Sequence, residues 1–386
     1  MQKSKTDSVL IVAGEASSAL YARRLLELYQ EKQIYHHFFG VGDYSMEKMG
    51  FERLGQSEKM AVVGFQEVIK HYSDLKTVYD SVVDRCRENP PKYAVLLDYP
   101  GFNLKLAKDL KSMGIPVIYY ISPQLWAWKK GRIKLVQKYV DLMLVLFPFE
   151  KEFYKEHHVN VEFVGHPLLD ELSSNFYDQS YIEDMRGRFG VHRNEVLVGL
   201  LPGSRQSELD YNLTTQLQSA VLLHQARENI KIALLVAPGL EIDQIKERMP
   251  EDLGIPLIFM QDDPMKMVSL IDIALCASGT ATVLVGLLKK PMAIMYKMNP
   301  FTAWLAKLLV RGIKHFGMVN LICEKEVCKE FFQREASAKN LSDEVLKLID
   351  NKPYFDDQVK DLERLKNLLG DHGATQRVFD ALMRFE

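Results

Sequence analysis

Cysteine is scarce in this sequence and forms no recurring pattern. The four cysteines are Cys86, Cys276, Cys323 and Cys328, and only the last two lie close together. A disulfide framework or a structural zinc site needs several cysteines, or cysteines with histidines, at short regular spacings. The sequence therefore predicts reduced thiols and no bound metal.

Long apolar runs and an excess of one charge are also missing. The first apolar run, residues 9–13, is too short for a signal-peptide core, and no later segment reaches a membrane-spanning length without charges. The 49 lysines and arginines against 51 aspartates and glutamates give a formal net charge of -2. This balance provides no general attraction for nucleic acid. We therefore expect a cytoplasmic protein that meets any anionic ligand through a local patch.

Two common nucleotide motifs are absent as well. The first predicted strand ends in Gly14-Glu15-Ala16-Ser17, so the Gly-x-Gly-x-x-Gly fingerprint of dinucleotide-binding folds is missing, and so is a Walker loop. The sequence thus argues against a nicotinamide- or flavin-dinucleotide enzyme and against a P-loop nucleotidase.

What the sequence does contain is two series of short apolar runs that alternate with amphipathic stretches. The runs are residues 9–13, 35–39, 94–98, 117–122, 142–147 and 161–164, then 196–201, 232–236, 257–260, 273–276 and 293–296. Continuous apolarity is typical of parallel strands that helices cover on both faces. We predict an α/β protein with two Rossmann-like, doubly wound lobes facing a central cleft. The expected lobes are residues 1–168 and 190–355, joined by a linker at 169–189, with a last helix at 358–386 that packs back on the first lobe.

Two turns in the second lobe favour a phosphate ligand. Leu-Pro-Gly-Ser-Arg at 201–205 follows one strand, and a Ser-Gly-Thr turn at 278–280 follows another and opens a helix. Backbone N–H groups at such turns, a helix dipole and an arginine fork all attract phosphate, although each turn alone also fits a plain helix cap. Since both turns follow strands that should be neighbours, we expect a nucleoside diphosphate held without a metal. The residues expected to bind it are Gly203, Ser204, Arg205, Glu208, Ser278, Gly279 and Thr280.

Carboxylates follow two strands of the first lobe. Asp98 ends one strand and Glu15 follows another. A carboxylate at the carboxyl end of a buried strand is well placed to take a proton from an attacking hydroxyl. The alternative is a purely structural role, in which the carboxylate caps the next turn. We expect Asp98 to be the catalytic base, with Glu15 orienting the acceptor or replacing Asp98 as the base.

Aromatic and cationic residues follow a further strand of the same lobe. Ser122-Pro-Gln-Leu-Trp126-Ala-Trp128 is followed by Lys129, Lys130 and Arg132. The tryptophans and cations can bind a sugar ring and a phosphate, or the tryptophans can simply close the top of the lobe. His166, in Gly-His-Pro at 165–167, is a candidate contact at the hinge, where a structural role is the alternative.

Taken together, these motifs resemble the lipid-A-disaccharide synthase family of Gram-negative outer-membrane biogenesis. The resemblance adds Met-Ala-Val-Val-Gly-Phe-Gln-Glu-Val at 60–68, Phe-Pro-Phe-Glu at 147–150, Lys-Met-Asn-Pro-Phe-Thr-Ala-Trp at 297–304 and Asn-Leu at 320–321, in family order to about Glu330. It implies a GT-B fold and an inverting transfer from UDP-2,3-diacylglucosamine to 2,3-diacylglucosamine 1-phosphate (lipid X). The product would be the β-1,6 lipid A disaccharide 1-phosphate, with UDP released and no cofactor.

The resemblance also implies roles for residues of this chain. Arg205 and the 278–280 turn would stabilise charge on the departing UDP, and Asp98 would accept the proton of the acceptor 6-hydroxyl. The remaining expected substrate contacts are Gly14, Ser17, Asn103, Ser122, Trp126, Trp128, His166 and Asn320.

Three positions depart from the family pattern. Ser18-Ala19 stands where Gly-Asp is usual, Gly101 where many members have Asp, and Leu284 where a glutamate that commonly holds the ribose is usual. Two alternatives therefore stay open: another UDP-sugar enzyme of this architecture, such as an epimerase, and a lipid- or nucleotide-binding paralogue without activity.

Lipid substrates imply contact with a membrane surface. The 300–316 stretch carries Phe301, Trp304 and leucines at helical spacing, interleaved with cations, which is typical of an interfacial helix but also of a helix packed on its own lobe. Val62, Val63, Phe65 and Ile69 form a second apolar set that could hold acyl chains. We expect peripheral association with the cytoplasmic face of the inner membrane.

Overall fold

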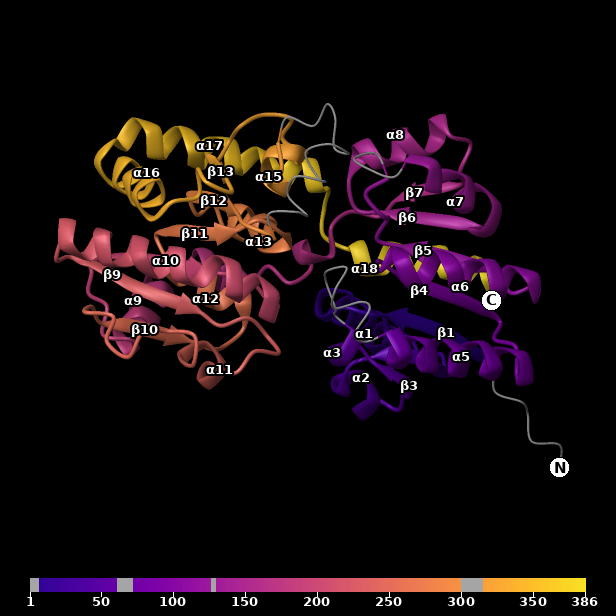
Figure 1. The fold of residues 1–386 in the computed structure, drawn as a ribbon. Helices are drawn as coiled ribbons and strands as arrows, with labels where there is room; N and C mark the ends of the chain where they lie inside the picture. Colours follow the sequence, from indigo (N-terminus) through magenta and orange to yellow (C-terminus); the bar gives the residue numbers. More distant parts are fainter. Residues whose placement is uncertain (1–6, 61–71, 126–129, 300–314) are drawn as a thin grey trace. The chain divides into compact units, whose positions relative to one another are not determined.

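The computed structural model describes residues 7–60, 72–125, 130–299 and 315–386, which fall into two compact units (Figure 1). The first unit comprises Met1–Asp170 and Leu369–Glu386, and the second Glu171–Leu368. Most of the expected linker at 169–189 therefore belongs to the second unit, where it contains helix α9 (Gln179–Arg188). The expected helix at 358–386 is two helices, of which α17 (Lys352–Leu369) lies almost wholly in the second unit and α18 (Ala374–Leu382) in the first.

The first unit is built on a seven-stranded parallel sheet with the order β3-β2-β1-β4-β5-β6-β7. Its strands are β1 (Ser8–Ala13), β2 (His37–Gly42), β3 (Glu52–Gln56), β4 (Tyr93–Leu97), β5 (Val117–Tyr120), β6 (Leu142–Val145) and β7 (Val161–Phe163). Its helices are α1 (Ala16–Glu31), α2 (Tyr44–Lys48), α3 (Ser57–Met60), α5 (Tyr72–Glu88), α6 (Pro100–Ser112), α7 (Ile133–Tyr139), α8 (Pro148–Glu156) and α18, with short 3-10 turns η1 (Lys130–Arg132), η2 (Pro167–Leu169) and η4 (Met383–Phe385).

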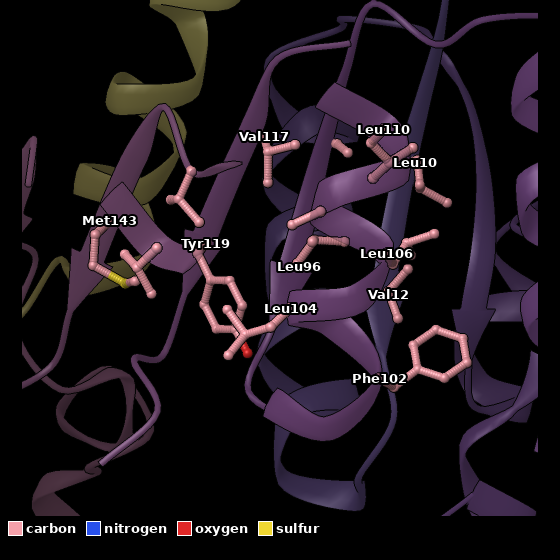
Figure 2. Packing of buried hydrophobic residues seen from close by; sticks show 14 of the residues in the cluster. Leu10, Val12, Leu96, Phe102, Leu104, Leu106, Leu110, Val117, Tyr119 and Met143 are labelled. Carbon is pink, nitrogen blue, oxygen red and sulfur yellow. The ribbon is translucent and has the colours of Figure 1, made fainter. Parts of the chain in front are cut away.

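The core of this unit explains why its strands read as continuous apolar runs. All five residues of β4 are buried, because helices cover both faces of a parallel sheet. Figure 2 shows leucines of α6, including Leu106 and Leu110, against Leu10 of β1 and Leu96 of β4, and all four are fully buried. At about 25 cal/mol per Å² of apolar surface, such burial is the main stabilising contribution to the unit.

The second unit is built on a six-stranded parallel sheet with the order β10-β9-β8-β11-β12-β13. Its strands are β8 (Val196–Leu201), β9 (Ile230–Leu235), β10 (Leu257–Met260), β11 (Ile273–Ala277), β12 (Met292–Tyr296) and β13 (Glu330–Phe332). Besides α9 and α17 it has α10 (Gln206–Ala226), α11 (Ile242–Lys246), α12 (Pro264–Leu270), α13 (Thr280–Leu287), α15 (Met318–Ile322), α16 (Ala338–Asp350) and the 3-10 turn η3 (Ser174–Tyr177). The predicted α/β class with two doubly wound sheets is confirmed.

Each sheet reverses its strand order once. In the first unit the reversal lies between β1 and β4, and in the second between β8 and β11. The loops that leave these strands run in opposite directions, which is where ligands bind in open α/β sheets. Among the described helices, none combines the length and apolarity needed to cross a bilayer.

Polar contacts with Val164 and Asp170, which follow β7, hold the C-terminal helix α18 within the first unit. The carboxylate of Asp170 accepts the backbone N–H groups of Gly373 (2.6 Å) and Thr375 (2.9 Å) and the Thr375 hydroxyl (2.9 Å), which caps α18. Arg377 of α18 donates through Nε to the carbonyl of Val164 (2.7 Å). These contacts join two chain segments more than two hundred residues apart in sequence.

Asp170→Ala should therefore weaken the first unit more than removal of an ordinary helix cap. Asp178, the exposed cap of α9, accepts the N–H groups of Ser180 and Tyr181 and provides the control. We expect Asp178→Ala to cost about 1 kcal/mol and Asp170→Ala about 2–3 kcal/mol, since more donors lose a charged acceptor. Urea unfolding measures both, and trypsin should cut faster at Arg377 only in Asp170→Ala. Equal losses in the two variants would contradict this role.

Candidate functional site

The two predicted phosphate turns leave neighbouring strands at the reversal point of the second unit. Leu201, the last residue of β8, pairs with Cys276 of β11. The Gly203–Arg205 turn and the Ser278–Thr280 turn therefore begin side by side at the carboxyl ends of the strands. The structure brings these two sets of predicted residues together.

Glu208 gives the turn after β8 its shape. Gly203 has a φ of 134°, and a Cβ atom there would lie 2.4 Å from the Glu208 Cβ. The Glu208 carboxylate accepts the Ser204 N–H through Oε2 (2.8 Å) and the Arg205 guanidinium through Oε1 (2.9 Å). Glu208 thus orients Arg205, which makes it a positioning residue.

Two buried amides of α10 hold the end of β8. Asn212 donates through Nδ2 to the carbonyl of Pro202 (3.1 Å), and Gln216 donates through Nε2 to the carbonyl of Leu201 (3.2 Å). Both side chains are buried. The sequence does not mark them as site residues, because a polar residue within an amphipathic helix carries no signal of its partner.

The turn after β11 presents backbone donors. The Ser278 N–H donates to the carbonyl of Met295 (2.9 Å), and the Thr282 hydroxyl donates to the carbonyl of Gly279 (2.8 Å), which closes the first turn of α13. Within the described part of the chain, the N–H groups of Thr280 and Ala281 have no acceptor. A helix start with open N–H groups carries about half a positive charge and attracts anions.

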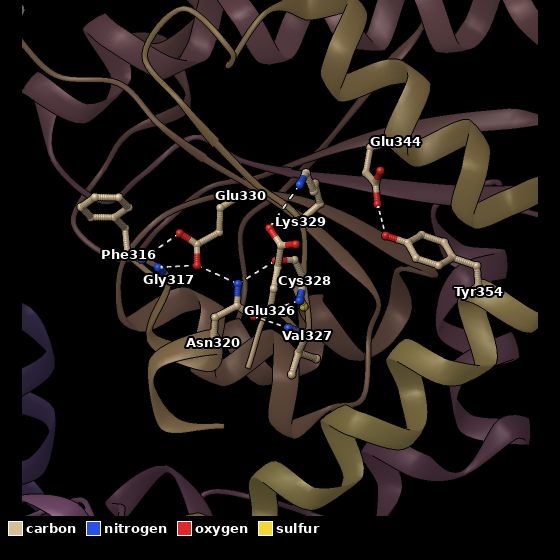
Figure 3. A network of polar contacts seen from close by, with 10 residues as sticks. All are labelled: Phe316, Gly317, Asn320, Glu326, Val327, Cys328, Lys329, Glu330, Glu344 and Tyr354. Carbon is tan, nitrogen blue, oxygen red and sulfur yellow. Dashed lines mark hydrogen bonds and ion pairs between the residues drawn. The ribbon is translucent and has the colours of Figure 1, made fainter. Parts of the chain in front are cut away.

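Asn320 joins the loop before β13 to Glu330 in a polar network of the second unit (Figure 3). Its Oδ1 accepts the N–H groups of Val327 (2.8 Å) and Cys328 (2.9 Å), and its Nδ2 donates to the Cys328 carbonyl (2.7 Å) and to Glu330 (2.6 Å). The amide is fully occupied, so it has no donor or acceptor left for a substrate.

The same network reaches Ser278 through Glu330. The Glu330 carboxylate accepts the N–H groups of Phe316 (2.7 Å) and Gly317 (3.1 Å), and the Phe316 carbonyl accepts the Ser278 hydroxyl (3.3 Å). Asn320 therefore acts on the turn after β11 through Glu330 and Phe316.

The first unit places the predicted catalytic carboxylates on either side of its own reversal point. Asp98 and Tyr99 follow β4 with positive φ angles of 48° and 45°, a conformation that costs energy outside glycine. The Asp98 carbonyl accepts the Tyr119 hydroxyl (2.5 Å) and the Asn103 Nδ2 (2.8 Å). These two contacts hold the strained backbone and so orient the Asp98 side chain.

Asn103 and Gly14 complete the same edge. Asn103 is fully buried and also donates to the Leu97 carbonyl (3.0 Å), while its Oδ1 has no donor within the described residues. Gly14 follows β1, and a Cβ there would lie 3.0 Å from the Tyr99 ring. The small residue therefore lets Tyr99 approach the end of β1.

Glu15 and Ser17 begin α1 beside Gly14. The Glu15 N–H donates to the Ser18 hydroxyl (3.0 Å), which in turn donates to the Glu15 carbonyl (2.8 Å). Ser18, one of the departures from the family pattern, thus fixes the backbone of a candidate catalytic residue. Ser17 is half-buried in the same first turn.

Ser122, two residues after β5, is held by a buried carboxylate. Its hydroxyl donates to Glu150 Oε1 (2.6 Å), and Glu150 Oε2 accepts the Phe147 N–H (3.2 Å). Glu150 is 2% exposed and anchors the segment that leads to Trp126 and Trp128. The two tryptophans lie outside the described residues, as do the 300–314 stretch and the apolar set Val62, Val63, Phe65 and Ile69.

His166 is enclosed in the first unit. Its ring contacts those of Tyr21 and Phe147, and its Nδ1 accepts the Leu168 N–H (3.2 Å). Burial lowers the pKa of His166 from 6.5 to about 3. The imidazole is therefore neutral at physiological pH, and its Nδ1 is committed to the backbone.

Sequence comparison relates the chain to one family over most of its length. Residues 9–377 match the family described as lipid-A-disaccharide synthetase. The lipid-A-disaccharide synthase of Trichlorobacter lovleyi is 37% identical over 371 residues, which cover 96% of this chain and 95% of that protein. The protein of the same name from Coxiella burnetii is 33% identical over 371 residues, covering 96% of both chains.

Solved structures share the fold at low sequence identity. The UDP-GlcNAc 2-epimerase of Neisseria meningitidis, bound to UDP-GlcNAc, aligns with a TM-score of 0.66 and 14% identity, covering 98% of this chain and 100% of that one. The S. aureus MnaA-UDP co-structure aligns with a TM-score of 0.68 and 10% identity, covering 98% and 97%. The likeness shows that the two units form a GT-B fold.

Gly203→Ala should destabilise the second unit beyond the cost of its backbone angle. Gly254 is the control, because its φ is 72° and a Cβ there would meet nothing within 4 Å. We expect Gly254→Ala to cost about 1–2 kcal/mol from the left-handed backbone alone. Gly203→Ala should cost about 1–3 kcal/mol more, because Glu208 must move. Urea unfolding of both variants is the measurement, and equal losses would show that the Glu208 contact does not matter.

His166 should make folding stability depend on pH in acid. Between pH 6.5 and about 3 the unfolded chain binds a proton at His166 that the folded chain does not. The contribution of neutral His166 is thus complete above pH 6.5 and is lost as the pH falls, at up to about 1.4 kcal/mol per unit. His166→Asn should be less stable at pH 7.5 but lose stability less steeply between pH 6 and 4. Parallel slopes in urea unfolding would refute this.

Proposed function

Since the chain belongs to the lipid-A-disaccharide synthetase family, glycosyltransferases that make the lipid A disaccharide, we propose that it joins UDP-2,3-diacylglucosamine to 2,3-diacylglucosamine 1-phosphate. The product is the β-1,6-linked disaccharide 1-phosphate, and UDP is released. The observation that carries the proposal is the pair of phosphate turns on adjacent strands β8 and β11, in a chain that aligns with synthases over 96% of its length.

The second unit binds the UDP part of the donor. Arg205, held by Glu208, and the open N–H groups of Thr280 and Ala281 face the same edge of the sheet. As the bond between the anomeric carbon and the phosphate oxygen breaks, negative charge develops on UDP. A positioned donor aimed at such charge contributes about 3–4 kcal/mol to transition-state stabilisation. Backbone donors and cations at this edge let the transfer proceed without a metal.

The first unit binds the acceptor and removes its proton. The acceptor 6-hydroxyl attacks the anomeric carbon from the face opposite UDP, so the new bond forms with inversion. The Asp98 carboxylate takes the hydroxyl proton during the attack, and the electrons of the broken bond leave with UDP. Asn103 and Tyr119 hold the Asp98 backbone in its strained conformation, which fixes the direction of the carboxylate. Glu15 orients the acceptor sugar from the start of α1.

Both substrates carry acyl chains, so the reaction takes place where the protein meets the cytoplasmic face of the membrane. Apolar and cationic residues of the 300–316 stretch are suited to that contact. Epimerases share the fold, yet the sequence relatives at 33–37% identity are synthases. An epimerase would turn over UDP-GlcNAc without a lipid acceptor, and a binding paralogue would bind lipid and release no UDP.

Asp98→Asn should abolish most of the transfer, because it removes the base and keeps the shape of the side chain. The assay follows UDP release from UDP-diacylglucosamine in EDTA, with and without diacylglucosamine 1-phosphate. We expect acceptor-dependent release that falls roughly 10²–10⁴-fold in Asp98→Asn. Glu15→Gln should fall less and mainly raise the KM for the acceptor.

Asp84→Asn is the matched control, since Asp84 is an exposed residue of α5 paired with Arg87. It should keep full activity. Release that needs no acceptor, or that survives in Asp98→Asn, would count against the proposed base. A folded protein that binds the lipids and releases no UDP would be a binding paralogue, and loss of activity in EDTA would show that a metal takes part.

A further inference from the structure

The strand beside β11 ends in a lysine that the site described above does not use. Lys297 directly follows β12, and the strand register pairs Ala277 of β11 with Met295 of β12. The Ser278 N–H still donates to the Met295 carbonyl, so the pairing continues past the end of the strands. If the same register is continued for two more residues, Lys297 pairs with Gly279. The Lys297 backbone then lies about one strand spacing (~4.8 Å) from the start of α13.

The side chain of Lys297 lies half-buried at the same edge of the sheet. Its Nζ donates to the hydroxyl of Thr215 (2.6 Å) on α10. The next residue of that helix, Gln216, donates to the carbonyl of Leu201, the last residue of β8. The ammonium group is thus tied to the part of α10 that holds the strand carrying the Arg205 turn.

The partner of Lys297 is neutral. Within the described residues, the one hydrogen-bond partner of the Lys297 ammonium group is the Thr215 hydroxyl. Burial lowers the pKa of Lys297, and no carboxylate of the described residues opposes this effect. An ammonium group has three donors, of which Thr215 uses one. Among the described residues this half-buried lysine has no acidic neighbour and no acceptor for its other two donors, which suits it to bind an anion.

An additional cation at these strand ends improves the charge balance with a bound diphosphate. Arg205 is paired with Glu208 at 2.9 Å, so the pair together carries little net charge. The start of α13 supplies about half a positive charge. A diphosphate carries several negative charges, more than this half-charge balances. Lys297 is the additional full positive charge that the described part of this edge provides.

We propose that Lys297 binds the diphosphate of the donor nucleotide and stabilises the charge on UDP as it leaves. This role rests on the proposed function and adds a residue to its donor site. The ammonium group keeps Thr215 as one hydrogen-bond partner and directs a second donor to a phosphate oxygen. Together with the guanidinium of Arg205 on the neighbouring side, it places N–H donors on both sides of the α13 start.

The same strand offers a matched control at its other end. Lys290 precedes β12, is also half-buried, and has its pKa lowered to about 8 by burial. Lys290 lies at the amino-terminal ends of the strands, opposite the phosphate turns, and near Asp272. Asp272 binds Arg186 and the N–H group of Leu197 at the beginning of β8. Lys290→Met therefore removes the same charge from the same unit without touching the phosphate turns.

The test is calorimetric titration of UDP, UMP and uridine into the full-length protein and its Lys297→Met, Lys297→Gln, Lys297→Arg and Lys290→Met variants. A hydrogen bond to a charged group contributes enough for a roughly 10–100-fold change in affinity. We expect Lys297→Met and Lys297→Gln to weaken UDP by that factor, UMP by less and uridine not at all. Lys297→Arg should restore much of the UDP affinity, and Lys290→Met should bind all three ligands as the parent protein does.

The three ligands separate a phosphate contact from a structural effect. Equal weakening of UDP and uridine would mean that Lys297 only supports the fold of the site, and unchanged UDP affinity in the folded neutral variants would mean that it does not bind the diphosphate. Either result overturns the assignment and leaves the proposed function standing. Failure of the folded parent protein to bind UDP would overturn the proposed function as well.

Discussion

Both units depend on one constraint, the parallel pairing of the two strands between which the strand order reverses. Ala13 pairs with Leu97 in the first unit, and Leu201 pairs with Cys276 in the second. Because helices bury both faces of each sheet, polar chemistry is confined to the loops that leave the strand ends. Where the order reverses, two of these loops emerge together and run apart. The carboxylates of the first unit and the phosphate turns of the second occupy these two places.

Buried amide side chains turn these strand ends into rigid sites. Asn103 donates to the carbonyls of Leu97 and Asp98, and Asn212 and Gln216 donate to those at the end of β8. Asn320 does the same for the segment that supports Ser278. A strand end has carbonyls that no neighbouring strand satisfies, and leaving one buried and unpaired costs about 1–3 kcal/mol. The amides remove that cost and also fix the direction in which the loops of the candidate site leave the sheet.

The sequence was sufficient to predict the fold class and the strand ends that carry the site. All eleven predicted runs overlap strands of the structure, because strands covered on both faces are continuously apolar. Two of these strands, β2 (His37–Gly42) and β9 (Ile230–Leu235), begin two residues away from the predicted start. The sequence did not reveal β3, whose residues Glu52, Arg53 and Gln56 are polar because an edge strand is only partly covered. It also missed β13 (Glu330–Phe332), an edge strand of three residues in the second sheet. Nor did it reveal the roles of Glu150 and Asn320. Their partners lie on other elements or across loops, so local patterns do not indicate which groups they hold.

The departures from the family pattern leave the contacts around the proposed base and the two phosphate turns in place. Ser18 makes a local cap for Glu15, and a side chain at Gly101 would meet nothing within 4 Å. Leu284 is buried in α13, one turn beyond the open N–H groups at its start. Arg205 is oriented by Glu208, and the Asp98 backbone by Asn103 and Tyr119. An apolar residue at position 284 therefore cannot accept hydrogen bonds from the ribose hydroxyls of a nucleoside, as the usual glutamate can. The groups that we propose for the proton and the diphosphate charge are held by other residues, so their contacts do not depend on the side chain at position 284.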